Sequence, residues 1–121
     1  VLKSCRHRPE QTKTWITDDI VETYTMLNRQ GLTHSLEVWT PEGELVAGCV
    51  YTQVGKTTAL ETSFTNIDSG GNFIIVKLVE KLKSEGIAWI DMKAPGDYLT
   101  KLGAKEIPRE EFMKLLHAGL N

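Results

Sequence analysis

The sequence has few cysteines and no long apolar run. Its 121 residues contain only two cysteines, Cys5 and Cys49, which are too few for a disulfide scaffold. No apolar stretch approaches the ~18–20 residues of a membrane-spanning helix, and the polar first ten residues do not resemble a secretion signal. We therefore expect a cytoplasmic protein in a reducing setting, with no membrane partner.

The chain also lacks a surplus of positive charge. It carries 14 lysines and arginines against 16 aspartates and glutamates, which gives a formal net charge of −2. Proteins that bind nucleic acid mainly through its phosphates usually show a basic surplus. Any contact with nucleic acid is therefore expected to be local and limited.

The length and composition are typical of one globular domain. Hydrophobic residues make up 40% of the chain and charged residues 25%. Thr17 is placed to cap a helix over 18–30, which Gly31 would end. Alternation and turn residues predict an antiparallel meander of three strands, at 35–40, 44–54 and 57–64.

A different pattern follows this meander. We expect a helix over 71–85, a buried strand over 87–92, a short helix over 97–102 and a last helix from Pro108. Residues 1–13 are polar and aperiodic and are interpreted as an N-terminal arm. The element order predicts an α+β fold in which helices pack on a mixed sheet.

Four motifs, in this order and at these separations, resemble the catalytic half of leucyl/phenylalanyl-tRNA–protein transferases. They are Thr14-Trp15-Ile16-Thr17, Gly31 to Trp39, Glu44 to Gly48 and Leu102 to Arg109. The resemblance extends from about Cys5 to Leu116. It implies a GNAT-like (acyl-CoA N-acyltransferase-like) fold in a single domain over 1–121. Family members also carry an N-terminal domain, and this chain starts after it, as a fragment or as a stand-alone relative.

The resemblance implies an aminoacyltransferase that acts in protein degradation by the N-end rule. Such an enzyme moves leucine or phenylalanine from aminoacyl-tRNA to the N-terminal amine of an acceptor protein. The expected partners are therefore the tRNA 3′ end and the acceptor N-terminus. No cofactor is implied, because the ester is already activated. No metal site is predicted either, because Cys5 and His7 alone do not make a zinc site.

The first catalytic position that the resemblance implies is Glu61. The family motif Gly-Glu-Ser-Met-Phe corresponds here to Leu60 to Phe64, so the glutamate is retained. Strand alternation puts Glu61 on the same side as Ala59 and Ser63. We expect it to bind an amine or a ribose hydroxyl; the alternative is a half-exposed strand carboxylate without a role.

The second catalytic motif departs from the family. Its Asp-x-Gln becomes Asp91-Met92-Lys93, with Asp91 and Lys93 expected on one face. The family glutamine is implied to accept a proton from the attacking amine, but a protonated lysine has no acceptor atom. Lys93 is expected either to stabilise an oxyanion or to pair with Asp91. Positioning supplies ~7–11 kcal/mol against about 3–5 kcal/mol from a general base, so a weaker transferase stays compatible with this change.

The resemblance also implies an amino-acid pocket and a tRNA-binding region. The pocket positions are Cys49, Thr58, Ile75, Leu78, Leu82 and Ile90. Four of them are aliphatic and suit leucine, although they are equally suited to a plain core. Thr58 replaces an aromatic residue of the family, which weakens the expectation for phenylalanine.

The residues implied to lie near the tRNA 3′ end are Trp15, Tyr24, Ser69, Gly70, Gly71 and Asn72. An aromatic ring can stack on a base, and free N–H groups at a helix start can bind an anion. The alternatives are a packing anchor for Trp15 and an ordinary glycine-rich helix start, since the family lysine is missing there.

Two other functions stay open at the level of sequence. One is a coenzyme A-dependent N-acyltransferase that uses the loop from Ser69 to Asn72. The other is a non-catalytic homologue that binds a partner or a small ligand through the implied amino-acid pocket. The sequence leaves the oligomeric state open.

Overall fold

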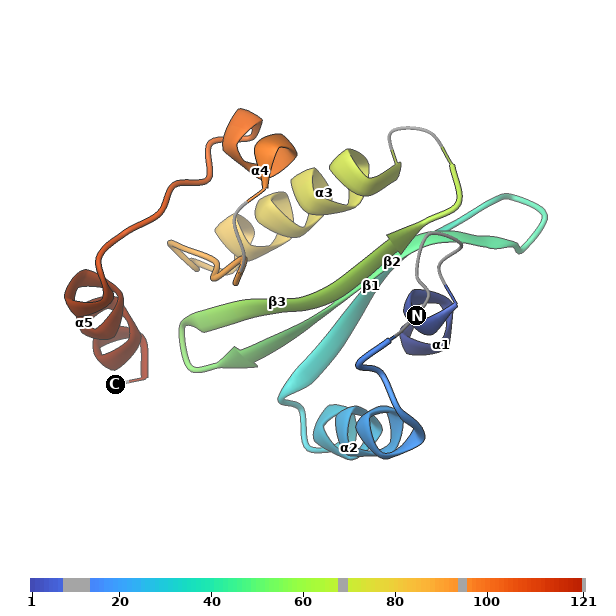
Figure 1. Ribbon diagram of the computed structural model, residues 1–121, viewed down its shortest axis with the longest axis horizontal. Coiled ribbons are helices and arrows are strands. Elements are labelled where there is room, and N and C mark those ends of the chain that lie inside the picture. The colour runs from blue at the N-terminus through green and yellow to red at the C-terminus, as the bar shows by residue number, and fades with distance from the viewer. Residues whose placement is uncertain (8–13, 68–69, 94–95, 121) are drawn as a thin grey trace.

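A three-stranded antiparallel sheet forms the centre of the molecule. The computed structural model describes residues 1–7, 14–67, 70–93 and 96–120 (Figure 1). The sheet consists of β1 (Thr33–Trp39), β2 (Leu45–Val54) and β3 (Thr57–Thr65), in the order β1-β2-β3. The predicted meander is confirmed. Its two turns contain Gly43 and Gly55, whose φ angles of +91° and +60° lie in the left-handed region that favours glycine.

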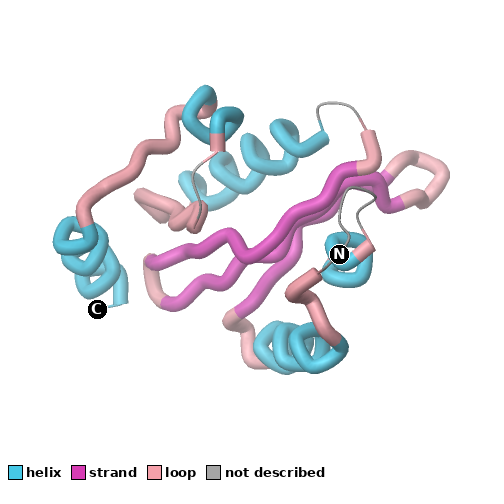
Figure 2. Tube along the Cα trace, viewed as in Figure 1, coloured by secondary structure: helices cyan, strands magenta, loops and turns pink. Residues whose placement is uncertain are grey.

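Helices cover both faces of this sheet (Figures 1 and 2). On one face lie α1 (Leu2–Arg6) and α2 (Asp18–Arg29), and on the other lies α3 (Gly70–Ser84). Two further helices, α4 (Asp97–Lys101) and α5 (Arg109–Leu120), follow α3 in the chain. The hydroxyl of Thr17 accepts the Ile20 N–H at 3.3 Å and caps α2 as predicted.

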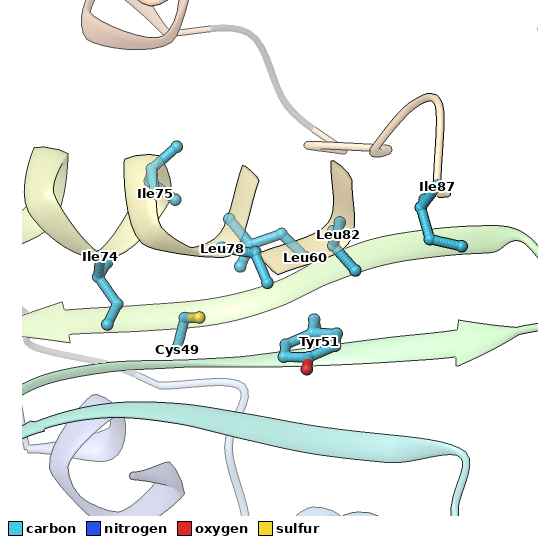
Figure 3. Packing of buried hydrophobic residues seen from close by; sticks show 8 residues of the cluster. All are labelled: Cys49, Tyr51, Leu60, Ile74, Ile75, Leu78, Leu82 and Ile87. Carbon is cyan, nitrogen blue, oxygen red and sulfur yellow. The ribbon is translucent and has the colours of Figure 1, made fainter. Parts of the chain in front are cut away.

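The main core lies between the sheet and α3. Leu78 and Leu82 are almost completely buried there against Tyr51 of β2 and Leu60 of β3 (Figure 3). Leu78 and Leu82 lie on one face of α3 at helical spacing, which is the pattern that predicted the helix. The buried members of this core are Cys49, Tyr51, Leu60, Ile74, Ile75, Leu78, Leu82 and Ile87.

A smaller core lies on the opposite face and corrects the interpretation of the N-terminal arm. Residues Leu2–Arg6 form α1, and Cys5 is completely buried with Ile16 and Phe64. The segment was expected to be irregular because its residues are polar and show no periodicity. Burial of Cys5 against the sheet favours a helical turn that the local pattern does not predict. Residues 8–13 lie outside the described part.

The predicted strand over 87–92 is also wrong, because only Asp91 pairs with the sheet. Asp91 forms an isolated parallel bridge with Ala59, and its N–H donates to the Thr58 carbonyl at 2.8 Å. Its carbonyl accepts the Leu60 N–H at 2.9 Å. The ladder stops there because the Lys93 N–H donates to Asp91 Oδ1 at 2.8 Å instead of to β3.

Candidate functional site

The Glu61 carboxylate receives donors from three different parts of the fold. The Tyr24 hydroxyl of α2 donates to its Oε2 at 3.1 Å, and the Thr52 hydroxyl of β2 donates to its Oε1 at 2.9 Å. The Lys93 ammonium donates to the same Oε2 as Tyr24 and forms an ion pair with it. Only 9% of the Glu61 side chain is exposed. The structure therefore holds a nearly buried carboxylate with both oxygens bonded.

A bulge in β3 sets the direction of Glu61. Val50 lies opposite Thr62 and Tyr51 lies opposite Leu60, so Glu61 is the extra residue between two pairs. A bulge turns two successive side chains toward the same side of the sheet and is often found beside active sites. Glu61 and Thr62 therefore both point to the face that carries α2, whereas Leu60 before them points to α3.

The bulge also corrects one detail of the predicted strand face. Ala59 lies opposite Thr52, whose hydroxyl bonds to Glu61, so Ala59 and Glu61 share a face as expected. Ser63 lies opposite Cys49, which belongs to the core under α3. Ser63 therefore points away from Glu61, because the extra residue shifts the alternation by one position.

The backbone at Lys93 brings its side chain to Glu61. Lys93 has a φ of +68°, the left-handed conformation, and its N–H is bonded to the Asp91 side chain. This conformation is uncommon for a residue other than glycine, and such strain is often found at functional sites. The sequence suggested Asp91 as the ion-pair partner of Lys93. In the structure the ammonium pairs with Glu61, and Asp91 fixes the backbone.

Two aromatic residues border this carboxylate. The rings of Trp15 and Tyr24 meet edge to face with their centroids 6.4 Å apart, and 48% of Trp15 is exposed. Burial, the negative charge of Glu61 and the hydrogen bond to it together raise the pKa of Tyr24 to about 12, and burial is the largest of these causes. Tyr24 is therefore a phenol, and a hydrogen-bond donor, at neutral pH. The sequence did not predict the hydrogen bonds that the Tyr24 and Thr52 hydroxyls donate to Glu61.

An apolar cavity lies on the other side of the segment that carries Asp91 and Lys93. Its volume is about 250 Å³, and Ile90 and Met92 line it together with residues of α3 and α4. Three of the six predicted pocket residues, Ile75, Leu82 and Ile90, line this cavity.

The other three predicted pocket residues do not line the cavity, and like Ile75 and Leu82 they are buried. Cys49 and Leu78 are completely buried in the cluster that also contains Tyr51 (Figure 3). Thr58 is also buried, and its hydroxyl has no hydrogen-bond partner among the described residues. The structure thus divides the predicted set, and its use as a binding pocket stays a prediction.

A second cavity, of about 470 Å³, is polar and is lined by other residues. His34 and Tyr51 contribute to its wall, with ring centroids 5.5 Å apart, and so do Lys81 of α3 and Glu85 in the turn after it. Burial raises the pKa of Tyr51, partly opposed by the nearby positive charge of Lys81. None of the residues at the Glu61 site lines this cavity.

The predicted anion site at the start of α3 lies partly outside the described residues. Ser69 lies outside the described part, α3 begins at Gly70, and Asn72 is exposed. The anion site stays a prediction. Within the described ranges, no three His, Cys, Asp or Glu side chains are grouped to hold a metal ion. No helix in those ranges is long and apolar enough to cross a membrane.

Comparison with known protein families gives a match over nearly the whole chain. The family model described as leucyl/phenylalanyl-tRNA protein transferase matches residues 1–117. A curated relative of that name from Nitrosomonas eutropha is 37% identical over 117 residues, which are 96% of this chain and 50% of the relative. A relative of the same name from Rubrobacter xylanophilus is 33% identical over 99% of this chain and 61% of its own length. The chain spans about half the length of the curated relatives it matches.

Comparison with solved structures identifies the fold. An acetyltransferase from Bacillus cereus has a TM-score of 0.52 and 15% identity, and the match covers 84% of this chain and 85% of that chain. Tetrahymena GCN5 has a TM-score of 0.53 and 11% identity, with 79% of each chain covered. The predicted GNAT-like α+β fold is confirmed.

Proposed function

Because this chain belongs to the leucyl/phenylalanyl-tRNA protein transferase family, we propose that it transfers leucine from an aminoacyl-tRNA to the N-terminal amine of an acceptor protein. The amine nitrogen bonds to the ester carbonyl carbon, and the bond between that carbon and the ribose oxygen of the tRNA breaks. The proton that the amine loses ends on this oxygen. The product is an acceptor extended by one residue, which is the mark that N-end rule degradation uses.

The observation that carries this proposal is the bonded, nearly buried carboxylate of Glu61. Its hydroxyl donors, Tyr24 and Thr52, orient it, and it lies beside the left-handed turn at Lys93. A fixed carboxylate of this kind suits an amine or a ribose hydroxyl, the two polar groups that meet at the reacting ester. We assign the reacting groups to the space next to Glu61 and Lys93.

Trp15 is proposed to contact the terminal adenosine of the tRNA. Its ring is about half exposed and contacts Tyr24 in a T-shaped arrangement, so part of the ring surface is open to a base. Stacking of a base on an aromatic side chain contributes ~1–3 kcal/mol and needs no excess of positive charge. This fits a chain whose net charge is −2.

The apolar cavity behind Asp91 and Lys93 is proposed to receive the leucine side chain. Ile90 and Met92 border the cavity, and the alternate residues of the same segment, Asp91 and Lys93, form the polar site. One short segment therefore separates an apolar pocket from a charged site. An amino acid also has an apolar group and a charged group close together, because its side chain and its amine are both attached to the α-carbon.

Catalysis in this proposal depends mainly on positioning. Holding an amine against an activated ester supplies ~7–11 kcal/mol of the barrier reduction. A terminal α-amine has a reference pKa of ~7.7–8.0, so near pH 7 a useful fraction is already neutral. Lys93 in its charged form cannot accept a proton, and the proposal requires no such step from it.

The test is an aminoacyl-transfer assay with Leu-tRNA and peptides that begin with arginine or lysine. We expect a leucine-extended peptide with the wild-type chain and at least a tenfold loss with Glu61→Gln. Glu37→Gln is the matched control, because Glu37 is an exposed carboxylate on β1 of the same sheet. A wild-type yield no higher than that of Glu61→Gln would refute the proposal.

Acetyl-CoA serves as a competing donor in the same assay. One of the structures with this fold, an N-acetyltransferase from Thermoplasma acidophilum, was solved in complex with coenzyme A, at a TM-score of 0.50 and 10% identity, with 71% of this chain and 65% of that chain covered. We expect no acetylated peptide and no thermal shift with acetyl-CoA. Acetylation of the peptide would favour an N-acyltransferase instead.

A further inference from the structure

The two partners of the Lys93–Glu61 ion pair differ in how firmly they are held. Glu61 has 9% of its side chain exposed and is fixed by the hydroxyls of Tyr24 and Thr52. Lys93 has 49% of its side chain exposed and reaches the carboxylate from the solvent side. The carboxylate is thus fixed by two neighbouring side chains, whereas the lysine that carries the ammonium is half exposed to solvent.

The Lys93 ammonium binds Glu61 in the way that the ammonium group of a bound ligand would. Lys93 lies 32 residues from Glu61 in sequence, on a segment that joins the sheet through Asp91 alone in the described part. Its Nζ is a primary ammonium group, and it binds the oxygen that Tyr24 also bonds. A carboxylate buried to this degree needs a cation beside it, whether the cation comes from the chain or from a ligand.

We propose that Glu61, Tyr24 and Thr52 form a binding site for the primary ammonium group of a substrate, and that Lys93 occupies this site when no substrate is bound. The inference rests on the proposed function, because the substrate ammonium is that of an amino acid or of a peptide N-terminus. A substrate amine must displace the Lys93 ammonium to reach Glu61 Oε2. Lys93 thereby holds the empty site in a self-inhibited state.

The effect of such competition on ligand affinity can be predicted. A site that its internal occupant fills for about nine-tenths of the time binds an external ligand about tenfold more weakly. Removing the Lys93 ammonium without shortening the side chain much should therefore strengthen ligand binding. Asp91 keeps its hydrogen bond to the Lys93 backbone in such a variant, because that bond does not involve the side chain of residue 93.

The experiment measures binding of L-leucinamide to the full chain by NMR or calorimetry. We expect Lys93→Met to bind it on the order of tenfold more tightly than the wild type. Lys101→Met is the matched control, because Lys101 is an exposed lysine of α4, and it should bind as the wild type does. N-acetyl-L-leucinamide, which has no ammonium group, should gain nothing from Lys93→Met. Unchanged or weaker leucinamide binding by Lys93→Met would overturn the inference.

A second measurement follows displacement directly and does not depend on a variant. Trace labelling of lysine amines with an acetylating reagent gives the reactivity of Lys93 relative to Lys101 in one sample. We expect leucinamide to raise this ratio and N-acetyl-leucinamide to leave it unchanged. A ratio that leucinamide does not move would contradict occupancy of the site by Lys93.

The two proposals fail separately. Aminoacyl transfer without displacement of Lys93 would leave the proposed function standing and overturn this inference. Displacement without transfer to any tested acceptor would support the ammonium site and refute the proposed reaction.

Discussion

The Tyr24 hydroxyl donates to the Glu61 carboxylate across 3.1 Å and so joins α2 to the third strand of the sheet. α2 otherwise packs mainly against β1, at the opposite edge of the sheet. This bond therefore fixes the helix over the site as well as the carboxylate within it. The same two side chains account for both the geometry of the site and part of the stability of the fold.

Removal of the hydroxyl should destabilise the fold. A hydrogen bond to a charged group contributes roughly 1.5–3 kcal/mol, and part of this is lost to water at a half-buried site. We expect Tyr24→Phe to lower the free energy of unfolding by about 1–2 kcal/mol in urea titrations. Tyr98→Phe is the control, because Tyr98 is exposed on α4. Equal urea midpoints for the two variants would show that the bond contributes nothing.

The raised pKa of Tyr24 should be visible in a spectrophotometric titration. The folded protein favours the protonated phenol, so this contribution to stability is complete below the ordinary pKa of 10.0 and is lost as the pH rises through about 12. Tyr24→Phe should remove a phenolate transition with a midpoint near 12. Glu61→Gln should lower that midpoint only in part, because burial is the larger cause. Loss of a transition near pH 10 in Tyr24→Phe would contradict this assignment.

Cys49 should resist alkylation in the folded protein. It is completely buried, and burial raises the pKa of its thiol to about 12, so the reactive thiolate is scarce at pH 8. We expect iodoacetamide to modify Cys49 only as fast as the chain unfolds, as followed by mass spectrometry of its peptide. Rapid labelling in the absence of denaturant, with the secondary structure intact, would show that the core under α3 is open.

Truncation of the main core should be costly at Leu78. Leu78 is completely buried between α3 and the sheet, and removing such a side chain costs about 2–5 kcal/mol. We expect Leu78→Ala to lower the free energy of unfolding by that amount. Val76→Ala on the same helix should change it by less than about 1 kcal/mol, because Val76 is exposed. Similar losses for both would mean that the two faces of α3 are not buried as described.

The two hairpin glycines should differ in their tolerance of alanine. Gly43 and Gly55 both have positive φ, but a Cβ at Gly55 would lie 2.6 Å from the Gly119 carbonyl oxygen, whereas a Cβ at Gly43 has no neighbour within 4 Å. Gly43→Ala should cost about 1–2 kcal/mol for the φ angle alone. Gly55→Ala should cost about 1–3 kcal/mol more, because α5 must move away from the turn. Equal losses in urea titrations would contradict close packing of α5 on this hairpin.

Much of the fold follows from local patterns. The meander was predicted because alternation and the turns at Gly43 and Gly55 act within a few residues. α2 was predicted because Thr17 caps it. The strand over 87–92 was wrong because its apolar residues Ile87, Ile90 and Met92 pack on the core, and an apolar pattern does not show whether the backbone also pairs with β3.

The sequence predicted which residues belong to the site better than it predicted the contacts between them. Glu61, Asp91 and Lys93 were expected from the family resemblance, and the structure brings them together. The ion pair between Lys93 and Glu61 was missed because it joins residues 32 positions apart through a left-handed turn. The predicted pocket was divided because Cys49, Thr58 and Leu78 are buried away from the apolar cavity, whereas Ile75, Leu82 and Ile90 line it.

Because β3 contains one extra residue, the face to which Glu61 points depends on how β3 pairs with β2. Deletion of Leu60 would restore a regular ladder between β2 and β3 and would place Glu61 opposite Tyr51. Such a strand would still contain a glutamate, but the acid would turn toward α3 and out of reach of Tyr24. Relatives that differ here by a single insertion or deletion should therefore be compared by register before their acidic residues are taken as equivalent.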